Sequence, residues 1–360
     1  MNIARIRLAA QHIAGNGFTT AKDLVSWMGA LQAQDFNMMK WAVGIRLPGS
    51  TEKSVDGAIN DGSVIRTHLM RPTWHLVSAD DIRWMLELTA PQIKRSMFAR
   101  HRDLEITENV VKKTRALLEK NLSGGNHLTR DELVKEFENA GMATGDNRAA
   151  HLLLSAELDG LICSGASRGK LPTYALLDER VPSSKPFNRA EALGWLTMRY
   201  FLSHGPATLP DFIWWSGLPA GDARKALEMI KPGLVSETYG EDVYWMAEST
   251  AAAGKSDPIM NFLPAYDEFI ISYRDRSAAL SEKHIAKAVS SNGIFRPVIV
   301  VDGQVTGLWK RTFKNNRLTV ETEFFIKQGK SASTRIEKAV LAYADFLELT
   351  SYGISNTNQT

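Results

Sequence analysis

The stretch at residues 128–141, LTRDELVKEFENAG, decides the fold. Thr129 stands just before a run of helical periodicity, and Glu132 follows it by three residues, which is the spacing of a capping box. In such a box the threonine hydroxyl accepts a backbone N–H group of the first turn, while the acid reaches back to the N-cap. The acid also complements the positive end of the helix. We therefore predict a helix that begins next to Thr129.

The same pattern occurs in two further stretches, TTAKDLVSWMG from residue 19 and ATLPDFIWWSG from residue 207. There Thr20 precedes Asp23, and Thr208 precedes Asp211. Each of the three boxes follows an amphipathic helical stretch and is followed by another helical stretch and a strand-like pair. This order of helices and hairpin is the winged-helix plan, with a helix-turn-helix inside it. The three copies are unequally spaced, which excludes a solenoid of fixed period.

The sequence changes character after about residue 255. FLPAYDEFIISYRDR, FRPVIVVDGQVTGLWKRTF and RLTVETEFF are typical of strands. Asp302-Gly303 and Asn315-Asn316 are turn pairs that predict hairpins. SASTRIEKAVLAYADFLEL predicts a closing amphipathic helix, and the polar tail TSYGISNTNQT predicts a stretch without regular structure.

The predicted fold is therefore α+β, with three tandem winged-helix motifs and a C-terminal β-rich region with a closing helix. Residues 1–80 are the first winged helix and carry a Gln-x-Gln motif. Residues 81–182 are the second, residues 183–250 are the third, and residues 255–350 are the β-rich region.

Composition indicates an ordinary globular protein, since 44% of the 360 residues are hydrophobic and 23% are charged. No run reaches the ~18 apolar residues of a membrane span, and the N-terminus is typical of an amphipathic helix rather than a signal peptide. The single cysteine, Cys163, excludes an internal disulfide and a multi-cysteine metal site. We expect a cytoplasmic protein with no membrane partner.

Several kinds of catalytic chemistry have no motif in this sequence. It has no Walker-type phosphate loop, no dinucleotide fingerprint and no His-Glu-x-x-His metal motif. Its histidines are scattered, and Cys163 lies in an apolar run where it is expected to pack in the core. We therefore expect no metal, no cofactor and no nucleotide cofactor.

Basic clusters are the more informative charge signal, because the net charge of +3 is too small to indicate a partner. The stretch GLWKRTFKNNR at residues 307–317 combines basic and aromatic residues around a hairpin tip, which suits a DNA groove or phosphates. A solvated edge hairpin is the alternative. IRTHLMRPTWH and SYRDR are two further clusters, and in the last Asp275 could instead form a local salt bridge. The candidate DNA-contacting residues are Arg66, His68, Arg71, Tyr273, Arg274, Arg276, Trp309, Lys310, Arg311, Lys314 and Arg317.

The stretch LQAQD at residues 31–35 places Gln32 and Gln34 in an apolar run. A glutamine is costly to bury unless both ends of its amide are hydrogen-bonded. Residues two apart in a helix diverge by about 200°, so these two amides could face one site only where the backbone leaves helical geometry. We place them at the corner between two predicted helices, with Asp35 as the N-cap of the next helix.

With these stretches in view, most of the chain resembles the winged-helix DNA glycosylases of the AlkZ type. The resemblance rests on LQAQD, IRTHLMRPTWHLV, LPAYDEFIISYRDR and VDGQVTGLWKR. It implies three tandem winged helices, excision of alkylated bases and unhooking of interstrand crosslinks. It also implies that Gln32 and Gln34 are the catalytic Gln-x-Gln motif, whereas a sister branch has Asp at the second position. The family's DNA-probing hairpin maps onto residues 307–317. Pro72 stands where the family pattern would have Gly.

The chemistry can be argued separately from the resemblance. A purine alkylated on a ring nitrogen is already cationic and leaves without a general acid. Two neutral amides could then orient the water that attacks the sugar, each contributing on the order of 10²-fold.

We therefore expect a monofunctional DNA glycosylase for cationic alkylated purines, monomeric on duplex DNA, with crosslinks left open as substrates. The alternatives are a non-catalytic winged-helix transcriptional regulator and a protein-interaction scaffold.

Overall fold

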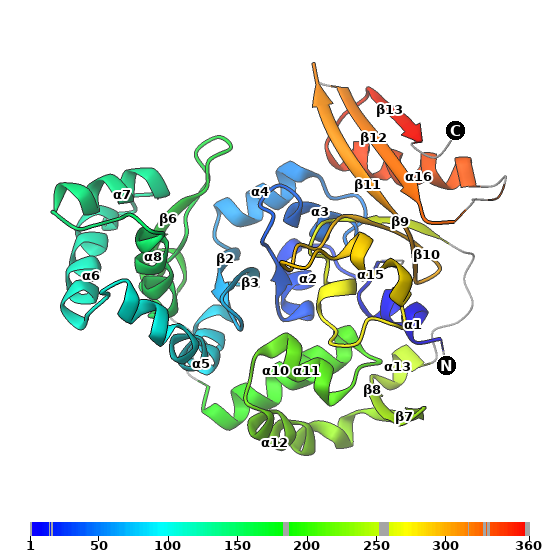
Figure 1. Cartoon of the computed structure of the whole chain (residues 1–360), viewed down its shortest axis with the longest axis horizontal. Helices are drawn as coiled ribbons and strands as arrows, with labels where there is room; N and C mark the ends of the chain where they lie inside the picture. The colour runs from blue at the N-terminus through cyan, green and yellow to red at the C-terminus, as the bar shows by residue number, and fades with distance from the viewer. Residues whose placement is uncertain are drawn as a thin grey trace.

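The computed structural model describes residues 2–13, 15, 17–182, 187–251, 259–315, 317–326, 329 and 332–356. It is a mixed α and β structure, with the N-terminal helices in the middle, a helical unit on one side and a β-sheet on the other (Figure 1). The predicted boundaries near residues 183 and 255 fall beside residues outside this description, and the predicted domain limits remain proposals.

The N-terminal region combines helices with a three-stranded antiparallel sheet of order β1-β3-β2. Thr20 accepts the N–H of Asp23 at 3.1 Å, which confirms the predicted cap of α2. The elements are α1 (Ile3–Ala10), α2 (Ala21–Met28), β1 (Leu31–Gln32), α3 (Met39–Gly44), α4 (Glu52–Asn60), β2 (Val64–Leu69) and β3 (Thr73–Ser78).

The second region has its own three-stranded sheet, of order β4-β6-β5, and its own core. Thr129 and Glu132 form the predicted capping box at the start of α7. The elements are α5 (Ile82–Asp103), α6 (Glu108–Leu122), β4 (Leu128–Thr129), α7 (Arg130–Asn139), α8 (Arg148–Leu158), β5 (Ile162–Ser164), β6 (Thr173–Leu176) and α9 (Leu177–Arg180).

The third region repeats this order, and Thr208 with Asp211 caps α11 as predicted. Ala207 forms an antiparallel bridge with Trp245, at the place where the second region has the short strand β4. The elements are α10 (Arg189–His204), α11 (Leu209–Ser216), α12 (Ala220–Ile230), the short 3₁₀ helix η1 (Lys231–Gly233), β7 (Val235–Tyr239), β8 (Asp242–Met246) and α13 (Glu248–Ala251).

The C-terminal region is built on a five-stranded sheet of order β13-β12-β11-β10-β9. Asp302 and Gly303 have φ of 51° and 84°, which confirms the predicted turn between β10 and β11. The closing helix α16 is also confirmed. The elements are β9 (Met260–Leu263), α14 (Glu268–Ile271), α15 (Glu282–Ala288), β10 (Val298–Val301), β11 (Gln304–Lys314), β12 (Arg317–Phe324), α16 (Ala332–Phe346) and β13 (Tyr352–Asn356).

The three capping boxes were predicted to begin equivalent helices of three similar units. This prediction is wrong for the first box. The helix capped by Thr20 precedes the short strand β1, whereas the helices capped by Thr129 and Thr208 follow their short strands. A capping box marks the start of a helix but not the position of that helix in a larger unit. The helix α4, at residues 52–60, was missing from the predicted order.

Two predictions for the C-terminal region are also wrong. The stretch at residues 263–276 continues from β9 into the short helix α14 instead of forming a long strand. The polar tail includes β13, which pairs in parallel with β12 and so covers the edge of the sheet.

One hydrophobic core joins the N-terminal helices to the C-terminal sheet. Trp41 of α3 packs against Tyr343 and Phe346 of α16, with ring centroids 5.0 Å and 5.2 Å apart. Trp309 of β11 also packs against Tyr343, with ring centroids 5.3 Å apart. Leu31 of β1 belongs to this same core.

Candidate active site

Gln32 lies in the short edge strand β1 and Gln34 just after it, in the segment that joins α2 to α3. Gln32 pairs with His75 of β3, and the N–H of Ala33 donates to the carbonyl oxygen of Trp74 at 2.7 Å. Leu31 and Ala33 are completely buried in the hydrophobic core. Alternate residues of an extended strand face the same side, but Gln34 lies beyond the end of β1, at a bend. The predicted position between two helices is confirmed, but the connection is a strand followed by a bend instead of a tight corner.

Within the described part of the chain, the hydrogen bonds of the two side-chain amides to the protein are long. The Gln32 carboxamide oxygen accepts from Nη2 of Arg71 at 3.4 Å. The Gln34 carboxamide oxygen accepts from the backbone N–H of Trp74, also at 3.4 Å. Bonds of this length are weak, so both amides can turn toward a water molecule or a ligand at little cost. Gln34 is exposed, while Gln32 is only 4% exposed and lies deeper.

Asp35 directly follows the Gln-x-Gln motif and stabilises the turn that comes after it. Its Oδ1 accepts the backbone N–H groups of Asn37 and Met38 at 2.9 Å and 3.0 Å. The helix α3 itself begins at Met39. Asp35 therefore caps the turn that leads into α3, close to the predicted N-cap role.

Arg66 holds the residue between the two glutamines. Its Nε and Nη2 donate to the carbonyl oxygen of Ala33 at 3.1 Å and 3.0 Å. The guanidinium stacks on the ring of Trp74, 3.9 Å from the centroid, and lies 5.4 Å from that of Phe36. Burial lowers the pKa of Arg66 to about 10, so the side chain stays charged at neutral pH. This placement favours a positioning role over the predicted direct contact with DNA.

Glu268 anchors the motif from the inside. Its Oε1 accepts the backbone N–H of Gln32 at 2.5 Å, and its Oε2 accepts from Nε1 of Trp215 at 3.1 Å. Ser272 donates to the same oxygen, and Nε2 of His204 lies 3.5 Å away. Burial alone would raise the pKa of this carboxyl, but its hydrogen bonds and the nearby histidines outweigh burial and hold the pKa at about 2. Glu268 is therefore an ionised carboxylate behind the glutamines.

Sequence reasoning missed Glu268 as a site residue. The available signal was the pair Asp267-Glu268 inside an otherwise apolar run. Asp267 is just as buried and pairs with both terminal nitrogens of Arg46, at 2.8 Å and 2.7 Å. Two adjacent buried acids thus fasten this loop to the N-terminal region.

The histidines near the site are unprotonated at neutral pH and have no proton to donate. Burial lowers the pKa of His75 to about 3, and burial also lowers the pKa of His204. His68, a predicted DNA contact, instead pairs with Glu157 of α8 at 2.7 Å and stacks on Trp74. In the described part of the chain no group of three histidine, cysteine or acidic residues could hold a metal ion.

Arg71 and Arg276 come together around Trp214 of α11. Their guanidinium carbons lie 5.5 Å and 5.2 Å from the centroid of its ring. Trp214 is 40% exposed, and its Nε1 donates to the carbonyl oxygen of Ile271 at 2.8 Å. Because Arg71 also contacts Gln32, this cation–aromatic cluster adjoins the glutamines. Trp214 was missed, since nothing near it in the sequence is basic.

Arg274 is exposed on the same loop as Arg276. The local salt bridge considered for Asp275 does not form, because Asp275 accepts from the N–H and hydroxyl of Ser277 at 2.8 Å and 3.0 Å. The backbone N–H of Arg274 is bound by Asp211 at 2.9 Å. The Arg274 guanidinium is therefore left facing solvent.

The β11–β12 hairpin projects beyond the rest of the C-terminal sheet (Figure 1). Lys310, Lys314 and Arg317 are exposed on it, and Phe313 is 51% exposed. Arg311 is half-buried and hydrogen-bonds the hydroxyl of Tyr343. The second turn asparagine, residue 316, lies outside the described residues.

Two candidate DNA contacts are buried instead. Trp309 is 1% exposed, and its Nε1 donates to the carbonyl oxygen of Leu263 at 2.8 Å. Tyr273 is also 1% exposed, and its hydroxyl donates to the carbonyl oxygen of His204 at 2.7 Å. Both rings fill the interior where the regions meet, so the expectation that they contact DNA is not met in this structure.

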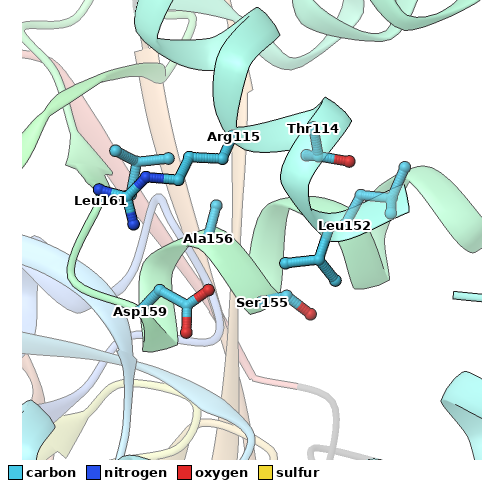
Figure 2. Close-up of a pocket in the computed structure, with 8 residues that line it drawn as sticks. Thr114, Arg115, Leu152, Ser155, Ala156, Asp159 and Leu161 are labelled. Atoms are coloured by element: carbon cyan, nitrogen blue, oxygen red, sulfur yellow. The ribbon is translucent and has the colours of Figure 1, made fainter. Parts of the chain in front are cut away.

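A small cavity in the second region lies apart from this site. Figure 2 shows it between α6 and α8, lined by Thr114, Leu152 and Ser155 among others. Its volume of about 10 Å³ is at the lower limit for one water molecule. It shares no residue with the glutamine site and is too small for an organic ligand.

No helix in the described part of the chain is long and apolar enough to cross a bilayer.

Comparison with known proteins agrees with the fold. The structure of Streptomyces sahachiroi DNA glycosylase AlkZ superposes with a TM-score of 0.82 at 22% identity, over 99% of this chain and 98% of that one. A relative from the same organism, described as an interstrand DNA cross-link repair glycosylase, is 23% identical over 326 residues, which are 84% of this chain and 85% of the relative. The family model described as DNA glycosylase AlkZ-like matches residues 25–346, which include both glutamines. The chain therefore belongs to the AlkZ-like family of DNA glycosylases, enzymes that act on N-glycosyl bonds of DNA.

Proposed function

We propose that the enzyme hydrolyses the N-glycosidic bond of cationic alkylated purines in duplex DNA, with water positioned by Gln32 and Gln34. One observation carries this proposal. Among the described residues, each amide oxygen has a single hydrogen bond to the protein, at 3.4 Å, and Gln34 is exposed to solvent. Loosely held neutral amides can bind and orient a water molecule without deprotonating it.

The protonation states around the motif suit a leaving base that already carries positive charge. His75 and His204 have lowered pKa values and are neutral at physiological pH, so neither supplies a proton to the base. A base alkylated on a ring nitrogen needs no such proton. A site without a proton donor would therefore act on activated lesions and leave normal purines intact.

The ionised Glu268 supports the developing positive charge on the sugar. Its carboxylate is fully buried and reaches the site through the backbone N–H of Gln32. In a poorly solvated interior a fixed negative charge acts over several ångströms, so it favours a cationic transition state without touching the substrate. Glu268 is accordingly a positioning residue with an electrostatic effect.

The product in this proposal is an abasic site, and the enzyme is monofunctional. The side chains that hydrogen-bond the glutamine motif in the described residues belong to Arg66, Arg71 and Glu268. None of them is an amine that could form a Schiff base with the sugar.

DNA would bind as a duplex, with a monomeric enzyme, across the surface that adjoins Gln34. We propose that Arg71, Arg274 and Arg276 contact phosphates beside the glutamines and that Trp214 stacks on an exposed base or sugar. Lys310, Lys314 and Arg317 would contact the duplex from the projecting hairpin. The similar order of helices and hairpins in the three regions supports three tandem winged helices as the scaffold.

Interstrand crosslinks are proposed as further substrates. Gln34 is exposed at the edge of a sheet and is not enclosed in a deep pocket. A crosslinked base is tied to the opposite strand and cannot swing freely into a closed pocket, so an open site suits it. The description of the Streptomyces relative as a cross-link repair glycosylase is consistent with this proposal.

Base release from a duplex that contains 7-methylguanine tests the proposal. The wild type should release the base, and Gln32→Ala with Gln34→Ala should lower release by about 10³- to 10⁴-fold, following on the order of 10²-fold for each group. Duplex affinity should change less than threefold. Gln92→Ala, a remote glutamine of α5, is the matched control. Equal losses of binding and release would assign the pair a structural role.

A further inference from the structure

A second pocket adjoins the glutamine motif. It has a volume of about 180 Å³ and an almost entirely apolar lining, and it lies between the N-terminal sheet and the β5–β6 hairpin. Phe36 and Trp74 are among its walls. Phe36 follows Gln34 by two residues, and the backbone N–H of Trp74 donates to the Gln34 side chain at 3.4 Å. Two residues that line the pocket are therefore neighbours of Gln34, one in the chain and one by a hydrogen bond.

Several aromatic rings line the pocket. Trp74 and Tyr174 have ring centroids 6.4 Å apart, and both line the pocket with Phe36. The Arg66 guanidinium lies 3.9 Å over the Trp74 ring and is part of the same lining. Aromatic walls with few exposed polar atoms favour a planar apolar group.

Two regions of the chain build this pocket and fix its shape. The N–H of Ser167 in the β5–β6 loop donates to Oδ1 of Asn60 at 2.8 Å. The N–H of Arg66 donates to the hydroxyl of Ser164 at 2.9 Å. Figure 1 shows this loop reaching toward α4, at the end of which Asn60 lies. The pocket is thus formed by hydrogen-bonded backbone on both sides.

We propose that this pocket is a subsite for a neutral aromatic group carried by a bulky alkyl lesion. The inference rests on the proposed function and extends it, because it names the kind of alkyl group that the enzyme prefers. The charged purine stays at Gln32 and Gln34, while its uncharged aryl substituent enters between Phe36, Trp74 and Tyr174. Simple methyl lesions leave the pocket unused.

The test compares duplexes that contain 7-benzylguanine or 7-methylguanine, with release normalised to the spontaneous loss of each base. Burying a phenyl-sized group changes an equilibrium by about tenfold or more. The wild type should therefore show a normalised kcat/KM about tenfold higher for the benzyl lesion. Ser167→Phe fills the pocket and should abolish this preference, while release of 7-methylguanine stays within twofold. Ser167→Ala is the matched control and should behave as wild type.

Equilibrium binding of both duplexes to Ser167→Phe and Ser167→Ala separates this inference from the proposed function. Failure of the wild type to release 7-methylguanine would overturn the proposed function, and the binding measurement would still decide the subsite. A wild type without preference for the benzyl lesion would overturn the subsite. So would a Ser167→Phe variant that loses activity on both lesions equally, because the pocket would then only join the two regions.

Discussion

Single residues decide how the Gln-x-Gln motif is held. The sequence singled out Gln32 and Gln34 as candidates, because two amides in an apolar run differ from their neighbours. It could not identify the support for them, since Arg66 and Glu268 act through the backbone of residues 33 and 32. Arg66 looked like a DNA contact because basic residues are expected at the surface. Its burial depends on Trp74 and Phe36, which only the folded chain brings beside it.

Replacing Arg66 by lysine tests its positioning role. A lysine keeps the charge but has no planar fork with which to donate two parallel hydrogen bonds to the Ala33 carbonyl. We expect kcat for 7-methylguanine release to fall about tenfold, which corresponds to about 1.4 kcal/mol, with KM and duplex affinity changed less than threefold. Arg274→Lys, at an exposed arginine, is the control. An unchanged kcat, or a loss seen only in affinity, would argue against the clamp.

The pH dependence of the rate follows from the same residues. His75, with a pKa of about 3, stays neutral above pH 5, and Arg66, with a pKa of about 10, stays charged up to pH 9. We therefore expect single-turnover release to be flat between about pH 5.5 and pH 9. A bell-shaped profile, or a step near pH 6.5, would reveal a titrating acid or base that the proposed mechanism lacks.

The same pKa values make the fold less stable in acid. A histidine whose pKa is lowered on folding contributes stability above its unfolded pKa of 6.5, and this stability is lost as the pH falls toward its folded pKa. For His75 the free energy of unfolding should fall by about 1.4 kcal/mol per pH unit below pH 6. Urea titrations at pH 7, 6 and 5 measure this slope. His75→Gln should make it shallower, and an unchanged slope in that variant would contradict the assignment.

At the scale of helices and strands, local sequence patterns correctly predicted where helices begin and where a hairpin turns. They did not predict the position of each helix or strand within its region. The threonine boxes do begin helices, and Asp302-Gly303 does form a turn. The strand β1 was missed because two residues of strand have no periodicity to detect. β1 forms because it pairs with the edge of β3. This pairing is a tertiary contact and does not follow from local propensity.

The β11–β12 hairpin gives a test at this scale. Lys310, Lys314 and Arg317 are exposed on it, and removing one cation that binds a phosphate should reduce the slope of log K against log salt by about 0.9. The triple alanine variant should therefore lower the slope by about 2 to 3 for undamaged duplex. Lys338→Ala, on the closing helix, should leave it unchanged. A triple variant with the wild-type slope would remove the hairpin from the DNA interface.

Across the whole molecule, the site depends on residues that are far apart in the chain. Gln32 is held by Glu268, and the core beneath it joins Trp41 to Trp309 and Tyr343. The predicted division into a helical body and a separate β-rich part did not anticipate this shared core. Charge patterns predicted Trp309 and Tyr273 at the surface, but both rings fill the junction between regions. Contacts between residues so far apart in the chain cannot be predicted from residue spacing or composition.

The central claim is that a site without a general acid requires a leaving base that is already cationic. Duplexes with 7-methylguanine or 7-deaza-7-methylguanine at one position test it most directly, because the two bases have nearly the same shape and differ in charge. We expect similar affinity for both duplexes, release of 7-methylguanine, and release of the neutral analogue that is slower by on the order of 10³-fold or more. Comparable release of the two bases in single-turnover assays would contradict the claim.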